Sequence, residues 1–335
     1  MQAAIYGLAG PELTEDERKF FRDADPAGYI LFQRNCCSIE QLRRLNDDLR
    51  ALSGRPDLPI LIDQEGGRVA RMRPPEWPAF PRAEAFAELY ALAPSSAIEA
   101  TRVNARAIAL TLRAAGINVN CLPLLDVRRP GASDIIGDRA LGDEPMQVAA
   151  LGRAVLDGMA SAGVVGVVKH MPGHGRALVD SHKELPVVTA SDEELVVDVE
   201  PFERLRSAPM GMTAHVVYTA WDPDRPASLS PTVIGAIIRE RIGFDGFLMS
   251  DDIGMHALAG DFGTRAAEVV AAGCDVALHC SGDMGEMDAV ASSVRALSAE
   301  GEARLARAMA GTLVEADDLE FAEAVAKRDA LLALV

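Results

Sequence analysis

The sequence contains no run rich in lysine or arginine, and its 33 basic residues are outnumbered by 50 acidic ones, which gives a formal net charge of −17. Proteins that bind nucleic acid need a basic surface, so we expect no nucleic-acid partner. The chain also lacks a stretch of about 18 consecutive apolar residues, and no membrane span is expected. Met1–Gly7 contains neither a basic segment nor a long apolar one, so we expect no export signal there.

Cysteine is scarce as well. The chain has five cysteines, an odd number without the spacing of a disulfide framework. Free thiols are the rule in a reducing compartment, so together with the missing export signal they predict a cytoplasmic protein without disulfide bonds. The cysteines are Cys36, Cys37, Cys121, Cys274 and Cys280.

Short apolar segments that end abruptly in polar residues recur along the 335 residues. Each is apolar on both faces, as parallel strands are when helices cover them. Because 49% of the residues are hydrophobic, the chain can bury a large core around such strands. The eight predicted strands are 3–8, 29–32, 59–62, 117–122, 164–168, 210–214, 247–249 and 276–278.

Helix signals lie between the predicted strands. Two are capping boxes, in which a serine and a glutamate three residues later start a helix, and a third is a serine followed by proline at the first helical position. Eight strands alternating with helices predict an α/β fold, a (β/α)8 TIM barrel that forms a single catalytic domain over residues 1–335. A doubly wound open sheet is the alternative. The three helix starts are Ser96-x-x-Glu99, Ser191-x-x-Glu194 and Ser230-Pro231.

Polar residues gather directly after the predicted strands. Barrel enzymes place their chemistry at the carboxyl ends of the strands. One polar residue there is ordinary loop chemistry, but six of them after four strands indicate a functional site. They are Asp63, Lys169, His170, His215, Asp251 and Asp252.

The segment Lys169–Gly175 and the following Asp180-Ser181-His182 form the richest of these loops. Its proline and glycines prevent a helix. In an extended loop Asp180 and His182 point to the same side, where the carboxylate can fix the imidazole tautomer and make His182 a proton shuttle near neutral pH. A structural histidine in a solvated loop is the alternative. Few large apolar residues hold this loop, so we expect it to close when a sugar binds.

Two further segments carry carboxylates. Ile62–Arg71 places two acids and two arginines around a Gly-Gly turn, and an Asp-Arg pair can bind sugar hydroxyls through bidentate hydrogen bonds. A buried structural ion pair is the alternative. In Ser250–Asp252 the two adjacent carboxylates cannot both point into the barrel mouth. One can act as a nucleophile while the other orients the loop, and periodicity does not decide between Asp251 and Asp252.

A metal site needs separate consideration, because His170, His174, Asp180 and His182 are residue types found in hydrolytic metal centres. No His-x-His follows an early strand and no His-Glu-x-x-His is present. The Pro-Gly pair between His170 and His174 also prevents the helix that would place them on one face. We therefore expect no metal, and a metal-dependent hydrolase on the same barrel remains the alternative function.

Five segments, in this order, resemble the motif set of glycoside hydrolase family 3, in the version of the bacterial β-N-acetylglucosaminidases of peptidoglycan recycling. The resemblance extends from about residue 3 to about residue 285. Its most specific part is the block Gly-His-Gly-x4-Asp-Ser-His. The five segments are Ile62–Val69, Ile136–Arg139, Lys169–Gly175, Asp180–His182 and Ser250–Asp252.

The resemblance implies a retaining exo-β-N-acetylglucosaminidase that removes non-reducing GlcNAc from peptidoglycan-derived GlcNAc-1,6-anhydroMurNAc, a saccharide or muropeptide substrate, through a covalent intermediate. It implies no cofactor. By motif position Asp251 is the nucleophile, His182 the acid/base and Asp180 its partner. The residues implied to bind the sugar are Asp63, Arg71, Arg139, Lys169 and His170.

The chain departs from the family pattern at two places. Met171 lies where the family leads us to expect Phe, a change that should affect packing more than chemistry. Cys280–Asp283 is also less like the family than the rest.

A non-catalytic sugar-binding protein is the third function to be tested.

Overall fold

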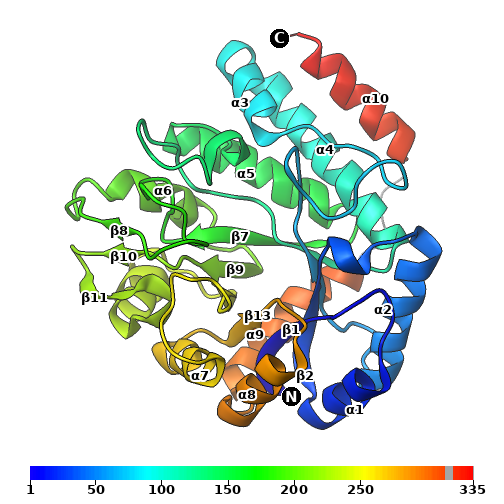
Figure 1. Ribbon diagram of the computed structural model, residues 1–335. Coiled ribbons are helices and arrows are strands. Elements are labelled where there is room, and N and C mark those ends of the chain that lie inside the picture. The colour runs from blue at the N-terminus through cyan, green and yellow to red at the C-terminus, as the bar shows by residue number, and fades with distance from the viewer. Residues whose placement is uncertain (314–319, 335) are drawn as a thin grey trace.

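The computed structural model describes residues 1–313 and 320–334, and eight parallel strands form its centre. These strands are β1 (Gln2–Gly7), β2 (Pro26–Leu31), β3 (Ile60–Ile62), β6 (Val119–Asn120), β7 (Val165–Met171), β9 (Met210–Thr213), β12 (Phe247–Asp252) and β13 (Val276–His279). They close into a barrel in the order β1-β13-β12-β9-β7-β6-β3-β2, with helices around it (Figure 1).

Each of the eight predicted apolar runs overlaps one barrel strand, so the predicted (β/α)8 TIM barrel is confirmed. β1 pairs in parallel with both β2 and β13, where Ile5 lies opposite Gly28 and Leu278. An open sheet would leave the outermost strands with a free edge, so the doubly wound alternative is wrong. The strands are buried on both faces because the barrel interior covers one face and the helices cover the other.

The helices cover the outside of the barrel, and the last of them lies along α4 (Figure 1). Lys327 of this last helix pairs with Glu99, and Arg328 donates a 3.2 Å hydrogen bond to the side chain of Asn104. The helices are α1 (Glu15–Ala24), α2 (Ile39–Ser53), α3 (Ala83–Leu92), α4 (Pro94–Ala114), α5 (Pro145–Ala160), α6 (Val196–Arg204), η4 (Val233–Arg241), α7 (Phe262–Ala272), α8 (Met284–Ser293), α9 (Ala299–Met309) and α10 (Phe321–Leu332).

The predicted start of α4 is wrong. The helix begins at Pro94, and Ser96 lies inside its first turn rather than at its N-cap. Proline is favoured at the first helical position because the N–H that it lacks has no partner there. The carboxylate of Glu99, which a capping box would direct back to Ser96, instead pairs with Arg102 at 2.8 Å.

The predicted start at Ser230 is confirmed, whereas the one at Ser191 is wrong, because α6 begins at Val196 and the Ser191–Glu194 hydrogen bonds lie in the turn before it. The backbone N–H of Ser191 donates to the Glu194 carboxylate at 2.8 Å, and the backbone N–H of Glu194 donates to the Ser191 hydroxyl at 3.3 Å. These bonds cap a turn that leads into α6. Further along, the Ser230 hydroxyl accepts a 3.0 Å hydrogen bond from the backbone N–H of Val233, at the start of η4.

Two small sheets lie beside the barrel. β4 (Gln64–Gly66) and β5 (Val69–Ala70) form a hairpin directly after β3, and β8 (Val187–Val188), β10 (Val217–Tyr218) and β11 (Asp222–Pro226) form the second sheet. Among the described residues, no helix combines the length and the apolar character that a membrane span requires. The five cysteines are free, and burial raises the pKa of the Cys121 thiol well above its ordinary value.

Candidate active site

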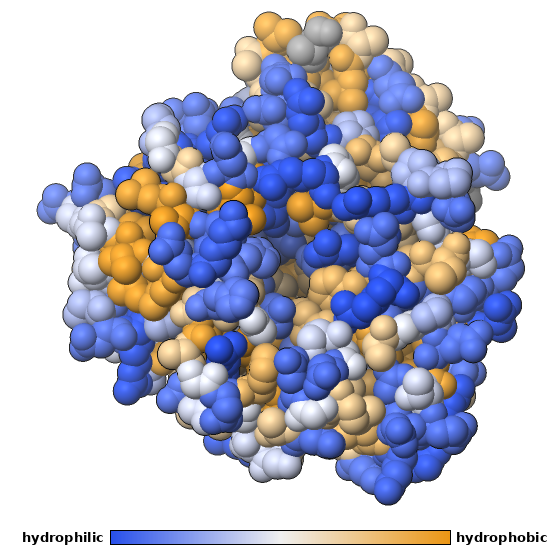
Figure 2. All heavy atoms as spheres, viewed as in Figure 1, coloured by the Kyte–Doolittle hydropathy of each residue, from blue (hydrophilic) through white to orange (hydrophobic). Residues whose placement is uncertain are grey.

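The strands open at their carboxyl ends into a pocket of about 270 Å³. Figure 2 shows it as a hollow near the centre of the face, bordered largely by hydrophilic residues. Seven of the eight residues predicted for the site line this pocket, and Asp180, the eighth, contacts His182. The seven are Asp63, Arg71, Arg139, Lys169, His170, His182 and Asp251.

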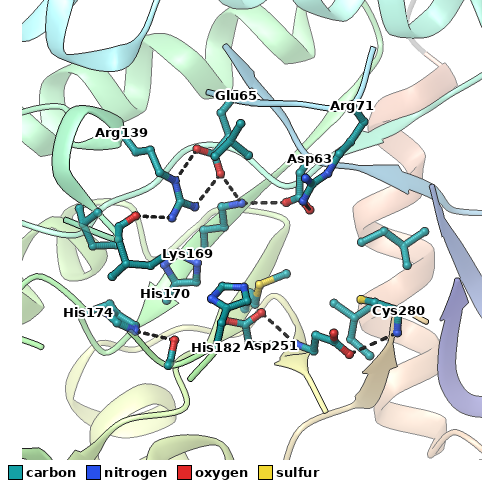
Figure 3. A pocket seen from close by; sticks show the side chains of 18 of the residues that line it. Asp63, Glu65, Arg71, Arg139, Lys169, His170, His174, His182, Asp251 and Cys280 are labelled. Atoms are coloured by element: carbon teal, nitrogen blue, oxygen red, sulfur yellow. Dashed lines mark hydrogen bonds and ion pairs between the residues drawn. The ribbon is translucent and has the colours of Figure 1, made fainter. Parts of the chain in front are cut away.

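A network of charged side chains forms one wall of the pocket (Figure 3). The Lys169 ammonium lies 2.9 Å from the Asp63 carboxylate and 2.8 Å from that of Glu65. Arg71 donates to Asp63 at 3.0 Å, and Arg139 donates to both carboxylate oxygens of Glu65, at 2.8 and 2.9 Å. Asp63, Glu65 and Arg71 all lie in the segment after β3, whereas Arg139 follows β6 and Lys169 belongs to β7, so the network joins three parts of the barrel.

Burial and charge act against each other in this network. Burial alone would raise the pKa of Asp63, but Lys169 and Arg71 outweigh it and hold that pKa far below its ordinary value. Arg139 and Lys169 likewise lower the pKa of Glu65 to about 2. The Lys169 side chain is only 2% exposed, yet the two carboxylates raise its pKa. Asp63, Glu65 and Lys169 are therefore all charged at neutral pH.

Asp126 is a site residue that the sequence analysis missed. Its carboxylate is completely buried and lies 2.7 Å from Nδ1 of His170, and it also accepts the backbone N–H of His174 at 2.7 Å. Burial would raise the pKa of Asp126, but His170 lowers it to about 2, so the carboxylate is ionised and Nδ1 of His170 is the donor. A signal existed in the sequence, because the apolar run 122–125 ends in Asp126 as the other runs end in their polar residues.

His174 supports the loop from inside the protein. Its Nε2 lies 3.1 Å from the Ser181 hydroxyl, and burial lowers its pKa to about 4, so the ring is neutral at neutral pH. The predicted metal candidates His170, His174 and His182 thus have three different partners, namely Asp126, Ser181 and Asp180. In residues 1–313 and 320–334, no three His, Cys, Asp or Glu side chains are arranged to hold a metal ion.

Asp180 and His182 lie on the same side of their loop, as predicted. Oδ1 of Asp180 is 3.0 Å from Nδ1 of His182 and accepts the backbone N–H of the same histidine at 2.9 Å. Burial raises the pKa of Asp180, but the two hydrogen bonds from His182 and the nearby positive charges together outweigh it, and the net shift is downward. The His182 side chain is 61% exposed and lines the pocket. The carboxylate thus fixes the imidazole with Nδ1 protonated and leaves Nε2 available.

Asp251 and Asp252 lie in different surroundings although both border the pocket. The backbone N–H groups of Gly254 and Cys280 donate to Oδ1 of Asp252 at 2.9 and 3.3 Å, which ties Asp252 to two loops. Burial raises the pKa of Asp252. Burial also opposes ionisation of Asp251, but the nearby His170 and other donors outweigh it and lower its pKa. Asp251 is therefore ionised at neutral pH, and in the described part of the chain its carboxylate accepts fewer hydrogen bonds than that of Asp252.

Besides Asp180, His215 and Met171 were also singled out in the sequence and lie outside the pocket lining. His215 is completely buried, with Nδ1 2.6 Å from the Ser228 hydroxyl and Nε2 3.0 Å from the backbone carbonyl of Asp252. Met171 is also fully buried, and its methyl group occupies the space beside Gly211 where a Cβ atom would lie. His215 therefore supports the Asp252 backbone, and Met171 contributes to packing.

This chain matches one known protein family and several known proteins. The family model described as the glycosyl hydrolase family 3 N terminal domain matches residues 3–311. The chain is 40% identical over 316 residues to a beta-hexosaminidase of Methylococcus capsulatus, a match that covers 92% of this chain and 91% of the relative. It is 41% identical over 282 residues to a beta-hexosaminidase of Alkalilimnicola ehrlichii, with 83% and 80% covered.

Solved structures share the fold over nearly the whole chain. NagZ from Neisseria gonorrhoeae in complex with N-trifluoroacetyl-D-glucosamine has a TM-score of 0.85 and 32% identity, and the match covers 99% of this chain and 96% of that one. A glycoside hydrolase family 3 beta-N-acetylglucosaminidase from a Paenibacillus species has a TM-score of 0.80 and 32% identity. That match covers 98% of this chain and 60% of the Paenibacillus chain.

Proposed function

Since this chain belongs to glycoside hydrolase family 3, and is therefore a glycoside hydrolase, we propose that it removes non-reducing β-linked N-acetylglucosamine with retention of configuration. Its substrate in this proposal is peptidoglycan-derived GlcNAc-1,6-anhydroMurNAc, with or without the peptide. The observation that carries the proposal is an ionised carboxylate, Asp251, in one pocket with a His182–Asp180 pair. A retaining hydrolase needs a carboxylate nucleophile and a separate proton donor.

In the first step His182, protonated on both nitrogens, gives its Nε2 proton to the glycosidic oxygen while Asp251 attacks the anomeric carbon. The C–O bond to the leaving sugar breaks, and an ester bond between sugar and Asp251 forms. In the second step the now neutral Nε2 takes a proton from water, whose oxygen attacks the anomeric carbon and releases Asp251. Asp180 keeps Nδ1 protonated throughout, because it accepts the Nδ1 hydrogen.

The charged wall opposite this pair has the character of a sugar-binding surface. We propose that Asp63, Arg71, Arg139, Lys169 and His170 bind the hydroxyl and acetamido groups of the GlcNAc. The support is that they line the same pocket, that ion pairs fix their positions, and that charged donors and acceptors form strong hydrogen bonds to neutral polyols.

We further propose that residues 1–335 form one catalytic domain that acts in the cytoplasm on saccharides or muropeptides. Five free cysteines and the muropeptide substrate of the proposal both suit a reducing compartment where cell-wall fragments are reused.

The proposal is tested with a panel of nitrophenyl β-glycosides and the anhydro-disaccharide, each with and without phosphate. We expect cleavage of the N-acetylglucosaminides, a β-configured first product by NMR, and no dependence on phosphate. An α-configured first product would overturn the retaining mechanism, and a sugar phosphate product would make the protein a phosphorylase. Exhaustive chelation should leave the rate unchanged, whereas a loss that zinc restores would favour the metal-dependent alternative.

A further inference from the structure

The loop that carries His182 contacts the loop that follows Asp251. Nδ1 of His256, in the turn after β12, lies 2.8 Å from the backbone carbonyl oxygen of His182. A carbonyl oxygen only accepts, so the His256 ring must donate from Nδ1. We propose that His256 is a positioning residue that holds the acid/base His182 in register with the nucleophile Asp251. This inference rests on the proposed function, in which those two residues react with the same sugar.

The hydrogen bonds of His182 support this role. Its backbone N–H and its Nδ1 both contact Asp180, and its backbone carbonyl accepts from His256. Nε2 is the polar atom of His182 without a protein partner in the part of the chain described here. The backbone and one ring nitrogen are thus fixed, and the nitrogen that the mechanism uses is left for the substrate.

Burial does little to hold this segment in place. The side chain of His182 is 61% exposed, and Leu178 in the same loop is 69% exposed. Apart from the buried Ser181, residues 178–185 are exposed or half-buried, so this segment depends largely on hydrogen bonds for its position. Ser181 is fixed from the side of β7 by His174, at 3.1 Å, and His182 is fixed from the side of β12 by His256.

The two supports come from strands that are not neighbours. In the barrel, β9 lies between β7 and β12. The loop after β7 must therefore cross the end of β9 to bring His182 toward Asp251, and the His256 contact secures its far side. A displacement of about 1 Å at a reacting group is enough to slow a reaction by about 10²-fold, so a contact of this kind affects rate without touching the substrate.

The first test compares His256→Ala with His256→Asn. The Nδ2 group of asparagine can occupy nearly the place of the histidine Nδ1 and donate to the same carbonyl, so this variant should retain most of the activity. We expect His256→Ala to lower kcat on the anhydro-disaccharide about 10-fold, the size of one lost hydrogen bond, and to lower it less on a nitrophenyl glycoside that needs little protonation. KM should change little. Glu184→Ala, which alters an exposed side chain of the same loop, is the matched control.

Amide hydrogen exchange of residues 178–185 gives a readout that does not involve chemistry. Exchange should be faster in His256→Ala than in the wild type, and near wild type in His256→Asn and Glu184→Ala. Unchanged exchange in His256→Ala, or equal rate losses on both substrates, would overturn the positioning role.

His182→Ala, assayed in parallel, separates this inference from the function on which it rests. If His182→Ala loses equal activity on both substrates, the proposed mechanism fails, whatever His256 does. If His182→Ala is selective for the poor leaving group and His256→Ala is not, the inference about His256 alone fails.

Discussion

The backbone N–H of Asp252 donates a 2.8 Å hydrogen bond to Oδ1 of Asp251, so the two adjacent carboxylates point into different surroundings. Asp252 accepts from two loop amides, whereas Asp251 accepts from this one backbone group and borders the pocket. Asp251→Asn should therefore abolish turnover with little loss of stability, because it removes a negative charge from a pocket rather than from the core. Activity assays and thermal unfolding of the same preparation measure both effects.

A slow fluorinated glycoside provides the matching control for that substitution. It should label the wild-type protein at Asp251, as peptide mass spectrometry will reveal. Asp252→Ala should still be labelled but should unfold at a lower temperature, because two loop amides lose their acceptor at a cost of about 1–3 kcal/mol each at most. Labelling at Asp252 would refute the choice of nucleophile.

The His182–Asp180 pair predicts a dependence on the leaving group. Loss of a general acid typically costs on the order of 10²–10⁴ in rate. His182→Ala should show such a loss on the anhydro-disaccharide, whose leaving group needs a proton, and a much smaller loss on a nitrophenyl glycoside. Asp180→Asn should give the same pattern more weakly, because it disturbs only orientation and basicity. Single-turnover glycosylation rates measure this, and equal losses on both substrates would make His182 a binding residue.

The Lys169–Asp63 ion pair predicts energetic coupling. Lys169 is buried between Asp63 and Glu65, and removal of one partner of a buried pair typically costs about 3–5 kcal/mol. Asp63→Asn and Lys169→Met should each lower the free energy of unfolding, while the double variant should lose less than the sum by about 1–3 kcal/mol. Denaturant titrations of the wild type, the two single variants and the double variant measure this difference. Additive losses would mean that the two charges act independently.

His174 predicts a loss of stability in mild acid. Burial lowers its pKa in the folded protein from 6.5 to about 4. Between these values the unfolded chain binds a proton that the folded protein does not, so stability is complete above pH 6.5 and falls as the pH drops toward 4, by on the order of 3 kcal/mol. His174→Gln keeps a donor near Ser181 but does not titrate, and should flatten this part of the stability profile. An unchanged slope would contradict the prediction.

The fold could be predicted because its signals are local and repeated. Runs such as Val164–Val168 are apolar on both faces, a pattern that only covered parallel strands need, and eight of them suffice to close a barrel. The start of α4 was misplaced because Ser96 and Glu99 satisfy a capping pattern by themselves. Pro94, two residues earlier, provides the stronger helix start.

Site residues could be predicted from the sequence only where they directly follow a predicted strand. Asp63, Lys169 and Asp251 follow apolar runs and were found, whereas Asp126 was missed because Pro123 interrupts the run before it. Periodicity could not decide which of Asp251 and Asp252 is the nucleophile. One of the two backbone amides that bind Asp252 belongs to Cys280, which is distant in sequence. The contact of His256 with His182 joins residues 74 positions apart and has no local signal.

The pairing of β1 with β13 has a consequence for synthesis on the ribosome. Gly7 ends one strand and Val276 begins the other, so the barrel cannot close until roughly 270 further residues have been made. At about 5–20 residues per second, that interval is on the order of 10–50 s. Throughout it, one edge of β1 has no partner strand, and unpaired edges invite association with other chains. A product truncated before Val276 would keep this edge of β1 without its partner strand permanently.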